Sequence, residues 1–442
     1  MRLSRALRGW HGLCHLSLKS PIHPRKENHH EIRNSDAQQP VCRLPGAVRL
    51  HPWRHAGVSK LAMRKITWIS CALMLACTTT QSSTMASPVL SDNPVRSALD
   101  RAVDQAARDL FRNSCHVGLS VVVREGSSSY FYNYGSISRS KPQLPTRQNI
   151  YELASVTKTF TATLAAQAVA EGRMEPDRDF QTYLPGRYTN LSWQGKPMTL
   201  RTLLTHRSGM PRDIPDTDAL FAENNYATRP IHMLALFQGF GRDRFLSALH
   251  EVKLRSEPGT NEAYSNAGFL VVGLGLEQIY GKPFETLVRE RITQPQGMTS
   301  TGFTIAAADR TRLVSGYDRD RRSVPYRPQS AGAAWGLYAT PQDMAKYLRL
   351  QLDSRDPAIS VSHDPLVGSA DNGEAMAWNL GLDNDQRMLW HGGGSFGMSS
   401  QVVLYPGQHQ GMVLLANDAC EGTESALKNM AESIHQHLQL SP

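Results

Sequence analysis

The chain has 442 residues, enough for one or two domains of ordinary size with additional segments. A hydrophobic content of 40% is normal for a globular protein, and the net charge of +9 at first suggests a nucleic-acid partner. The charge is concentrated, however, because residues 1–62 hold 11 Lys and Arg against 3 Asp and Glu, which leaves the remainder close to neutral. This distribution argues against a nucleic-acid-binding body.

The N-terminal region changes character at Met63. Residues 1–62 carry many His and Pro, whereas residues 63–65 are basic and residues 66–76 form an apolar stretch too short to span a bilayer comfortably. The sequence Thr84-Met85-Ala86 ends in the small-residue style of a signal-peptidase site. We therefore interpret residues 63–86 as a signal peptide and residues 1–62 as an over-extended gene assignment, with a disordered basic arm as the alternative.

The cysteines add to this interpretation. Residues 73–77 half-resemble a bacterial lipobox, so Cys77 could carry lipid and attach the protein to a membrane; cleavage after Ala86 is the competing interpretation. Either one predicts an exported protein, periplasmic or secreted. If the leader ends at Ala86, Cys115 and Cys420 remain of the six cysteines. They are a candidate disulfide in an oxidising compartment, although spacing alone favours two unrelated buried thiols.

The first elements after the leader are a helix and a hairpin. Asn93-Pro94 predicts a helix start, and a helical face follows at Val95, Leu99, Val103, Ala106 and Leu110. Residues 117–123 predict a buried strand, and residues 130–134 its hairpin partner. A second helix is expected from Ser155 to about residue 171, with Gly172 as its C-cap.

The middle of the chain differs from both ends. Residues 173–330 are rich in Pro and turns and carry helical patches at 200–204, 245–249, 267–280 and 284–292, so we expect an inserted helical domain. Strand signals return at 388–390, 401–405 and 412–415, before a last helix with one apolar stripe. This order predicts an α/β (α+β) fold, in which residues 93–172 and 331–442 build one sheet flanked by the terminal helices.

Three motifs carry the chemistry. Ser155 and Lys158 lie three residues apart and therefore face the same way on a helix, which puts an amine within reach of a hydroxyl that is otherwise a weak nucleophile. Such a pair alone is more often an exposed helix face. Tyr264-Ser265-Asn266 and His391-Gly392-Gly393 follow in the chain, and the three motifs together indicate covalent serine catalysis on an acyl group.

These motifs resemble those of the serine β-lactamase and penicillin-binding transpeptidase superfamily, and within it the class C-like branch. That branch also contains D-alanyl-D-alanine carboxypeptidases, D-aminopeptidases and lactamase-fold esterases. The resemblance covers roughly residues 95–440 and implies an antiparallel sheet flanked by the terminal helices, with an inserted helical domain. Further segments that carry the resemblance lie at residues 203–211, 258–260, 295–298, 336–344 and 414–417.

The resemblance also implies roles for individual residues. Ser155 would be the nucleophile, at a helix N-terminus that favours developing negative charge. Lys158 and Tyr264 would share the work of general base, and which of them takes the proton is left open. Asn266 would bind the amide of the substrate and Lys158. The backbone N–H groups of Ser155 and Gly394 would form the oxyanion hole.

The third motif departs from true β-lactamases, which usually have Lys-Thr-Gly there. His391 is expected to be only partly charged near pH 7, and Gly392 lacks a hydroxyl, so the site should hold a carboxylate less firmly. The His-x-Gly form, with His391 and Gly393 as binding residues, is typical of D-peptidases, D-aminopeptidases and esterases. The resemblance therefore favours a D-alanyl-D-alanine carboxypeptidase or related D-peptidase, with a carboxylesterase or a class C-like β-lactamase as the alternative.

Other expectations follow from the same resemblance. The first and last strands of this fold are antiparallel neighbours, which implies a Cys115–Cys420 disulfide. No cofactor and no metal is expected, and His206 is read as shaping a loop. The expected partner is a small acyl substrate, and the protein is expected to be a monomer. Residues 215–242 are longer than the family needs and could either roof the site or form ordinary core.

The interpretation of the leader can be tested on the natural protein. We expect mass spectrometry to find an N-terminus at or after residue 63, with the mature chain beginning after Ala86 or at a lipidated Cys77. Peptides from residues 1–62 in the natural product would contradict the assignment and favour the basic arm.

Overall fold

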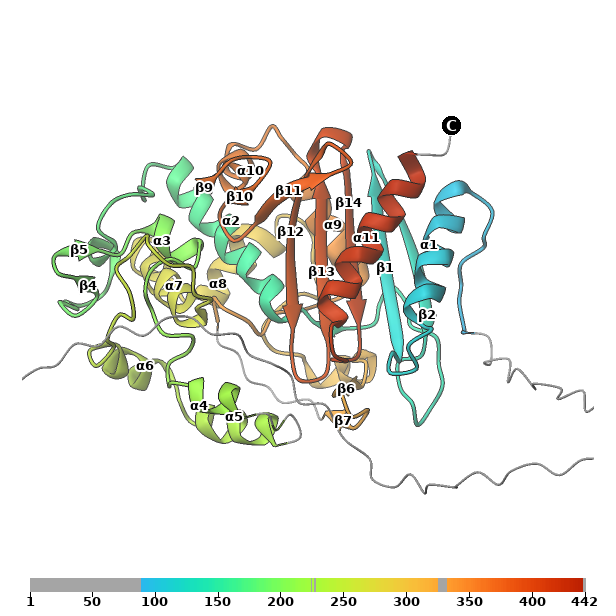
Figure 1. Cartoon of the computed structure of the whole chain (residues 1–442), viewed down its shortest axis with the longest axis horizontal. Coiled ribbons are helices and arrows are strands. Elements are labelled where there is room, and N and C mark those ends of the chain that lie inside the picture. The colour runs from blue at the N-terminus through green and yellow to red at the C-terminus, as the bar shows by residue number, and fades with distance from the viewer. Residues whose placement is uncertain (1–88, 224, 226–227, 325–331, 440–442) are drawn as a thin grey trace, which may run out of the picture. The chain divides into compact units, whose positions relative to one another are not determined.

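A computed structural model describes residues 89–442 apart from residues 224, 226–227, 325–331 and 440–442. The expected signal peptide, the basic extension and Cys77 lie outside the described residues. The body is built on an eight-stranded antiparallel sheet with the strand order β2-β1-β14-β13-β12-β11-β10-β9 (Figure 1). The predicted fold class, a mixed α/β architecture with a large antiparallel sheet, is confirmed.

The sheet joins the two ends of the described chain. β1 pairs antiparallel with β14, with Leu119 opposite Ala416, because both strands are apolar on both faces and belong at the centre of the sheet. Gly126, at φ +54°, makes the tight turn from β1 to β2. The strands are β1 (Gly118–Glu125), β2 (Ser128–Gly135), β9 (Val367–Gly368), β10 (Gly373–Glu374), β11 (Asn379–Asp383), β12 (Gln386–Gly394), β13 (Ser399–Tyr405) and β14 (Gln410–Ala416).

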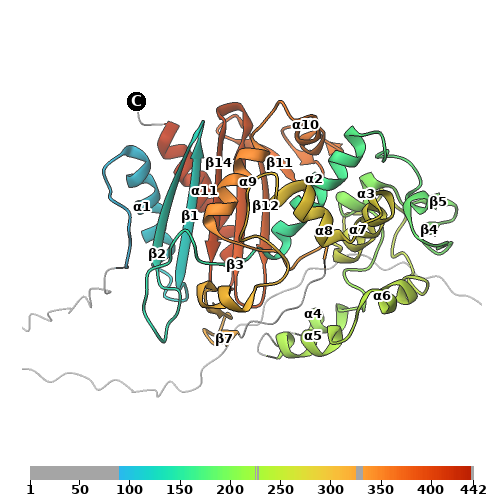
Figure 2. The ribbon, with the colours of Figure 1, turned by 180° about the vertical axis from the view of Figure 1, so that it is seen from behind.

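Helices cover the two faces of the sheet. α1 (Ala98–Leu110) and α11 (Thr423–Gln439) pack on one face, where their apolar stripes form a core with alternate residues of β1, β13 and β14. α2 (Thr157–Ala170) and α9 (Pro341–Gln351) belong to the larger core on the other face, which Figure 2 shows from behind. Successive side chains of a strand point to opposite faces of the sheet, so a sheet with helices on both faces places alternate residues in two different cores.

Helices dominate the segment between α2 and α9. They are α3 (Leu200–Leu204), α4 (Asp218–Ala222), α5 (Arg229–Phe237), α6 (Arg242–Leu249), α7 (Asn266–Tyr280) and α8 (Phe284–Val288); α10 (Pro357–His363) follows α9. Short two-stranded pairs accompany them: β3 (Tyr151–Glu152) with β8 (Tyr338–Ala339), β4 (Ser192–Trp193) with β5 (Lys196–Pro197), and β6 (Gly316–Tyr317) with β7 (Ser323–Val324). The division into a sheet domain and an inserted helical domain stays a prediction.

The first helix begins later than Asn93-Pro94 indicates, so that prediction is wrong. Ser97 is the N-cap: its side chain accepts from the Asp100 N–H, and the Asp100 carboxylate accepts from the Ser97 N–H in return. Asn93 is used elsewhere, since its Nδ2 donates to the hydroxyl of Tyr134 at 2.6 Å. Val95 has φ +50° and is exposed, so it belongs to the turn before the helix rather than to the helical face.

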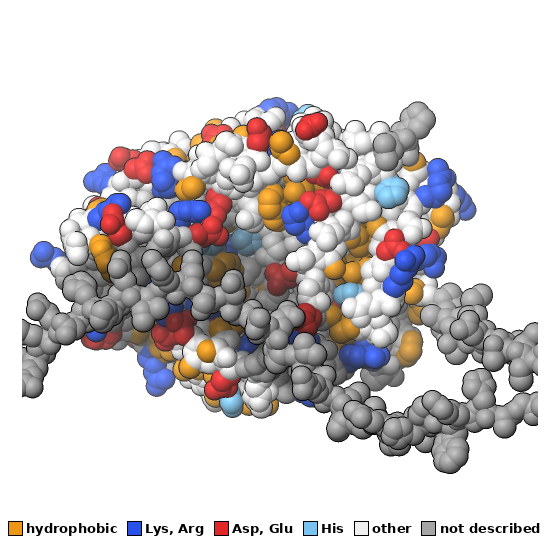
Figure 3. Space-filling view, in the orientation of Figure 1, with side chains coloured by type: hydrophobic (Ala, Val, Ile, Leu, Met, Phe, Trp, Pro, Cys, Tyr) orange, Lys and Arg blue, Asp and Glu red, His pale blue; other side chains and the backbone are white. Residues whose placement is uncertain are grey.

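The visible surface of the described residues carries charges of both signs. Figure 3 shows basic and acidic side chains interspersed over the face on which α11 lies, without a continuous basic area among the described residues. None of the helices in the described part of the chain combines the length and the apolar character that crossing a membrane requires.

A disulfide joins Cys115, just before β1, to Cys420, just after β14. It closes a loop of 305 residues, so in the unfolded chain it removes a large part of the loop-closure entropy. The link lies beside the paired strands that bring the two ends of the chain together.

Removing the disulfide should therefore lower stability without abolishing the fold. We expect Cys115→Ser/Cys420→Ser to lose about 2–5 kcal/mol and to melt several degrees below the wild type. Thermal melts of the two proteins, with wild type in reductant as the matched control, measure this difference. Equal melting temperatures, together with an alkylated mass that reductant does not change, would contradict the link.

Candidate active site

The candidate nucleophile lies in the turn that starts α2. Ser155 belongs to a single 3-10 turn, Ala154–Val156, which continues directly into α2 at Thr157. Ala154 has φ +45°, a backbone conformation that a residue with a Cβ rarely adopts and that the surrounding structure must enforce. This tight turn sets the hydroxyl of Ser155 at the N-terminal end of the helix, where free N–H groups favour negative charge.

Ser155, Lys158 and Tyr264 meet at hydrogen-bond distance. Ser155 Oγ lies 2.6 Å from the Tyr264 hydroxyl and 3.2 Å from Lys158 Nζ. Tyr264 comes from the loop before α7, more than a hundred residues after Ser155 in the chain. The packing of α7 against α2 therefore brings together the first two of the three sequence motifs.

Lys158 is completely buried, which favours its neutral form. Its Nζ contacts Asn266 Oδ1 at 2.7 Å and the carbonyl oxygen of Ala334 at 2.9 Å. Desolvation lowers the pKa of Lys158 well below its usual value, although the Asp213 carboxylate opposes this shift. A neutral amine has two N–H groups, and these two acceptors take both of them. Its lone pair is then directed at Ser155 Oγ.

Tyr264 is shifted in the opposite direction. Burial raises the pKa of its phenol above the usual value, with the Ser155 hydrogen bond and Arg212 opposing. The phenol therefore keeps its proton, and either hydroxyl can be the donor in its hydrogen bond with Ser155 Oγ. This pair of shifts favours Lys158 as the group that accepts the proton of Ser155, and the roles of the two residues stay predictions. His206 stacks on the Tyr264 ring at 4.3 Å, and its Nδ1 accepts the Ser265 N–H.

A buried carboxylate orients Asn266. Asn266 Nδ2 donates to Asp213 Oδ1 at 2.8 Å, and Thr217 Oγ1 donates to the other oxygen of Asp213 at 2.5 Å. Because a carboxylate only accepts, it fixes the amide so that its oxygen faces Lys158. Sequence reasoning missed Asp213; the one signal was its position two residues after the 203–211 segment.

The glycines of the third motif let β12 approach Ser155. A Cβ at Gly393 would lie 2.5 Å from the Leu153 carbonyl oxygen and 2.9 Å from the backbone nitrogen of Ser155. Only glycine permits this contact, so the strand end and the nucleophile are held together by backbone packing. Gly394 is the last residue of β12 and lines the neighbouring cleft. The oxyanion-hole role of its N–H stays a prediction.

His391 differs in charge from the sequence-based expectation. It is buried on β12, and its Nδ1 lies 2.5 Å from the carbonyl oxygen of Ala377, a residue held at φ +58°. Desolvation lowers the pKa of His391 to about 4. The ring is therefore neutral at pH 7, where partial charge was expected, because the sequence could not reveal its burial. Its Nδ1 carries the proton that Ala377 accepts.

A cleft of about 720 Å³ opens beside these residues, with Ala154, Asn266 and Gly394 in its wall. Phe221 of α4 and Trp335 contribute apolar surface to it, as do Met233, Leu234 and Phe237 of α5. No residue of α5 is buried, so of the two interpretations of residues 215–242, the structure favours a wall of the cleft over ordinary core.

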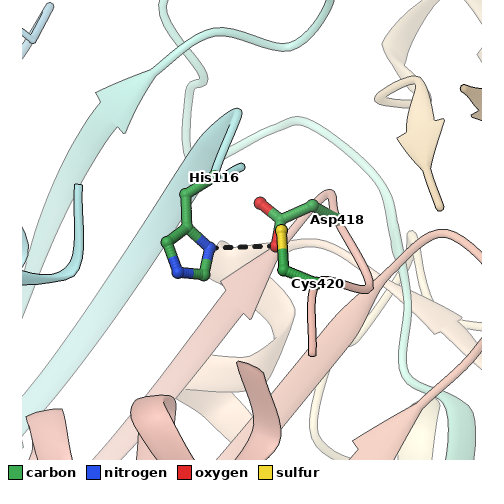
Figure 4. Close-up of side chains that lie close together, drawn as sticks. All are labelled: His116, Asp418 and Cys420. Atoms are coloured by element: carbon green, nitrogen blue, oxygen red, sulfur yellow. Dashed lines mark hydrogen bonds and ion pairs between the residues drawn. The ribbon is translucent and has the colours of Figure 1, made fainter. Parts of the chain in front are cut away.

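One group of described residues has the composition of a metal site: His116, Asp418 and Cys420 (Figure 4). Its sulfur is already bonded to Cys115, and a disulfide sulfur is not the thiolate that metals bind. The Asp418 oxygens are occupied by His116 Nδ1 and by the Val117 N–H, both at 3.0 Å. These residues therefore connect the start of β1 to the end of β14, and their chemistry fits this structural role better than it fits a metal site.

The comparisons with known proteins agree with this geometry. A family model described as Beta-lactamase matches residues 103–435. The chain belongs to this family of serine hydrolases. D-alanyl-D-alanine-carboxypeptidase/endopeptidase AmpH of Escherichia coli (strain K12) is 28% identical over 253 residues, 57% of this chain and 62% of AmpH. Protein flp of Staphylococcus aureus (strain N315) is 24% identical over 337 residues, 73% of this chain and 64% of flp. The chain thus spans less than two thirds of these relatives.

Solved structures show the same fold. A Beta-Lactamase/D-Alanine Carboxypeptidase from Pseudomonas syringae superposes with a TM-score of 0.64 at 21% identity, over 77% of this chain and 99% of that chain. A class C beta-lactamase superposes with the same TM-score at 19% identity, over 76% of this chain and 96% of that chain.

The burial of His391 predicts a pH dependence of stability. Its pKa is about 4 in the folded protein and near 6.5 when unfolded, so the unfolded state binds the proton first. Stability is then fully retained above pH 6.5 and is lost as the pH falls from 6.5 to 4. His391→Asn keeps a donor for Ala377 but does not titrate, and we expect it to lose less stability over this range.

Thermal melts at pH 7 and pH 4.5 measure the difference, with the exposed His232→Gln as the matched control. An equal loss of stability in wild type and His391→Asn would contradict a neutral, buried His391.

Proposed function

We propose that this protein is an exported serine hydrolase that forms an acyl-enzyme on Ser155 and acts on D-amino-acid peptides of the D-alanyl-D-alanine type. The observation that carries the proposal is the contact of one hydroxyl, Ser155 Oγ, with both a neutral buried amine and a protonated phenol. This arrangement provides a base to activate the nucleophile and an acid to protonate the leaving group in one site.

Acylation proceeds in balanced steps. Lys158 accepts the proton of Ser155 as Oγ attacks the carbonyl carbon, and the oxygen that becomes negative accepts N–H bonds from Ser155 and Gly394. Tyr264 then gives its proton to the leaving amine or alcohol as the acyl bond breaks. The ammonium of Lys158 returns a proton to Tyr264, which restores the neutral amine and the phenol.

Deacylation uses the same groups. Water takes the place of the leaving group, the neutral Lys158 and the hydroxyl of Tyr264 pass its proton to Ser155 Oγ, and the acid is released. No metal or cofactor enters either half of the reaction as proposed.

The substrate class is supported by the relatives rather than by the geometry. AmpH is named a D-alanyl-D-alanine carboxypeptidase/endopeptidase, and the Pseudomonas syringae protein a β-lactamase and D-alanine carboxypeptidase. Such substrates are outside the cytoplasm, which agrees with the signal peptide that we infer at residues 63–86. The His-x-Gly form of the third motif favours a D-peptidase over a β-lactamase.

An esterase is the second candidate, and one observation favours it. The cleft has an apolar wall from Phe221, Met233, Phe237 and Trp335, and His391 offers no positive charge for a carboxylate. An apolar ester would fit such a cleft. Both candidates share the acyl-enzyme and differ in the group that leaves.

Labelling with a fluorescent penicillin tests the proposal. We expect a stable adduct that Ser155→Ala abolishes, because the acyl bond forms at that hydroxyl, and that Lys158→Ala also abolishes. Tyr264→Phe should slow acylation about 10²–10⁴-fold, the usual contribution of an acid–base group. Intact mass after a chase measures the adduct, and Ser127→Ala, an exposed serine in the β1–β2 turn, is the matched control.

Labelling that persists in Ser155→Ala would overturn the acyl-enzyme. The absence of labelling, combined with Ser155-dependent hydrolysis of a p-nitrophenyl ester, would move the protein to the esterase candidate.

A further inference from the structure

A carboxylate lies over the glycine end of β12. Glu424, in the first turn of α11, has Oε1 2.3 Å from the position of a Cβ at Gly394 and Oε2 3.3 Å from the position of one at Gly392. The carboxyl group of Glu424 therefore occupies the space that side chains at these two positions would fill. A larger residue at 394 would displace it.

Glu424 has no hydrogen bond and no ion pair within the described residues, although it is solvent-accessible and lines the cleft. Glu421, three residues earlier, is by contrast paired with Arg319. Desolvation raises the pKa of Glu424, and Arg212 is among the charges that oppose this shift. Because Glu424 is accessible in the cleft wall and has no protein partner among the described residues, its carboxylate is available to a cationic group of a ligand.

The location of Glu424 relative to Ser155 follows from the strand. Successive residues of β12 point to opposite faces, so Gly393 faces the nitrogen of Ser155 while Gly392 and Gly394 face Glu424. β11 pairs with β12 only as far as Trp390, which leaves residues 391–394 with an open edge on that side. The leaving group of a substrate bound at Ser155 can extend past this strand end into the cleft, whose wall includes both Gly394 and Glu424.

We propose that Glu424 is a specificity-determining residue, which selects substrates with an ammonium group above Gly394 and disfavours those with a carboxylate there. The inference rests on the proposed acyl-enzyme at Ser155 and narrows its substrate class to D-amino-acid esters or amides with a cationic leaving group. The charged groups around Glu424 agree with this choice. Burial favours the neutral form of Lys158, and Arg212, which lies over the Phe221 ring at 4.1 Å, is 3.8 Å from the Asp213 carboxylate.

The expected size of the effect is modest, because the carboxylate is accessible to water. A solvated ion pair changes an equilibrium by a few-fold, and partial exclusion of water in a cleft increases that factor. We therefore expect about a five- to tenfold preference for a cationic substrate over its neutral isostere, and a similar discrimination against an anionic one.

Three esters of N-acetyl-D-alanine test this on the full chain at pH 8. Their alcohols are choline, the neutral isostere 3,3-dimethylbutanol, and glycolate, so all three form the same acyl-enzyme. Each kcat/KM is divided by the hydroxide-catalysed rate of the same ester, because the alcohols also differ in acidity, and the choline ester and its isostere are the pair matched in size. In the wild type kcat/KM should fall in that order. In Glu424→Gln the three values should agree to within about twofold. Glu421→Gln removes the same charge three residues away, outside the cleft wall, and should keep the wild-type order.

A preference that Glu424→Gln leaves unchanged, or that is absent in the wild type, overturns the role of Glu424 and leaves the proposed function standing. If no N-acetyl-D-alanyl ester is hydrolysed, the proposed function fails instead. Calorimetric binding of the choline ester and of its neutral isostere to Ser155→Ala then decides the inference, because it needs no turnover. Tighter binding of the choline ester, lost in Ser155→Ala/Glu424→Gln, supports it; equal binding of the two esters overturns it.

Discussion

The burial of the Lys158 amine is the constraint on which the rest of the site depends. Its Nζ is in contact with groups from three parts of the chain: Ser155 one turn earlier, Asn266 at the start of α7, and the carbonyl of Ala334 before β8. Burial disfavours a charged ammonium in this position, so the same packing that excludes water favours the neutral amine that the proposed mechanism uses as a base. The proposed activation of Ser155 therefore requires that the helical middle of the chain packs on α2.

The second constraint is the close approach of β12 to the turn that carries Ser155. This approach requires glycine at position 393. The position of β12 is set by the sheet, in which β12 pairs with β13, β13 with β14, and β14 with β1. The ends of β1 and β14 are joined in turn by the disulfide and by the His116–Asp418 hydrogen bond. Strands from both ends of the chain thus determine where the third motif lies relative to the first. Local backbone strain at Ala154 and Ala377, both at positive φ, is tolerated because this packing enforces it.

The charges along the cleft distinguish this protein from a site built to hold a carboxylate. His391 is neutral because it is buried, and Glu424 adds a negative charge next to the end of β12. Arg212 is the cation of the cleft wall closest to the chemistry in the described residues, and it is stacked between the rings of Phe221 and Tyr264 with Asp213 beside it. The proposed substrate selection therefore depends on the charge that a substrate carries past Gly394, in addition to the shape of its apolar part.

The sequence by itself was sufficient for the features that depend on local order. Helix spacing put Ser155 and Lys158 on one face, alternating and apolar runs indicated the strands, and the order of the three motifs indicated the fold and the chemistry. It misplaced the start of α1, because Asn93 and Ser97 are both good caps and only the contact of Asn93 with Tyr134 chooses between them. Sequence patterns did not reveal Asp213, Ala334 or Glu424, because these residues lie far along the chain from Ser155 and Lys158. The sequence also could not predict the directions of the pKa shifts of Lys158, Tyr264 and His391. Those directions depend on how much water each group loses when α2, α7 and β12 come together, and only the tertiary structure decides that.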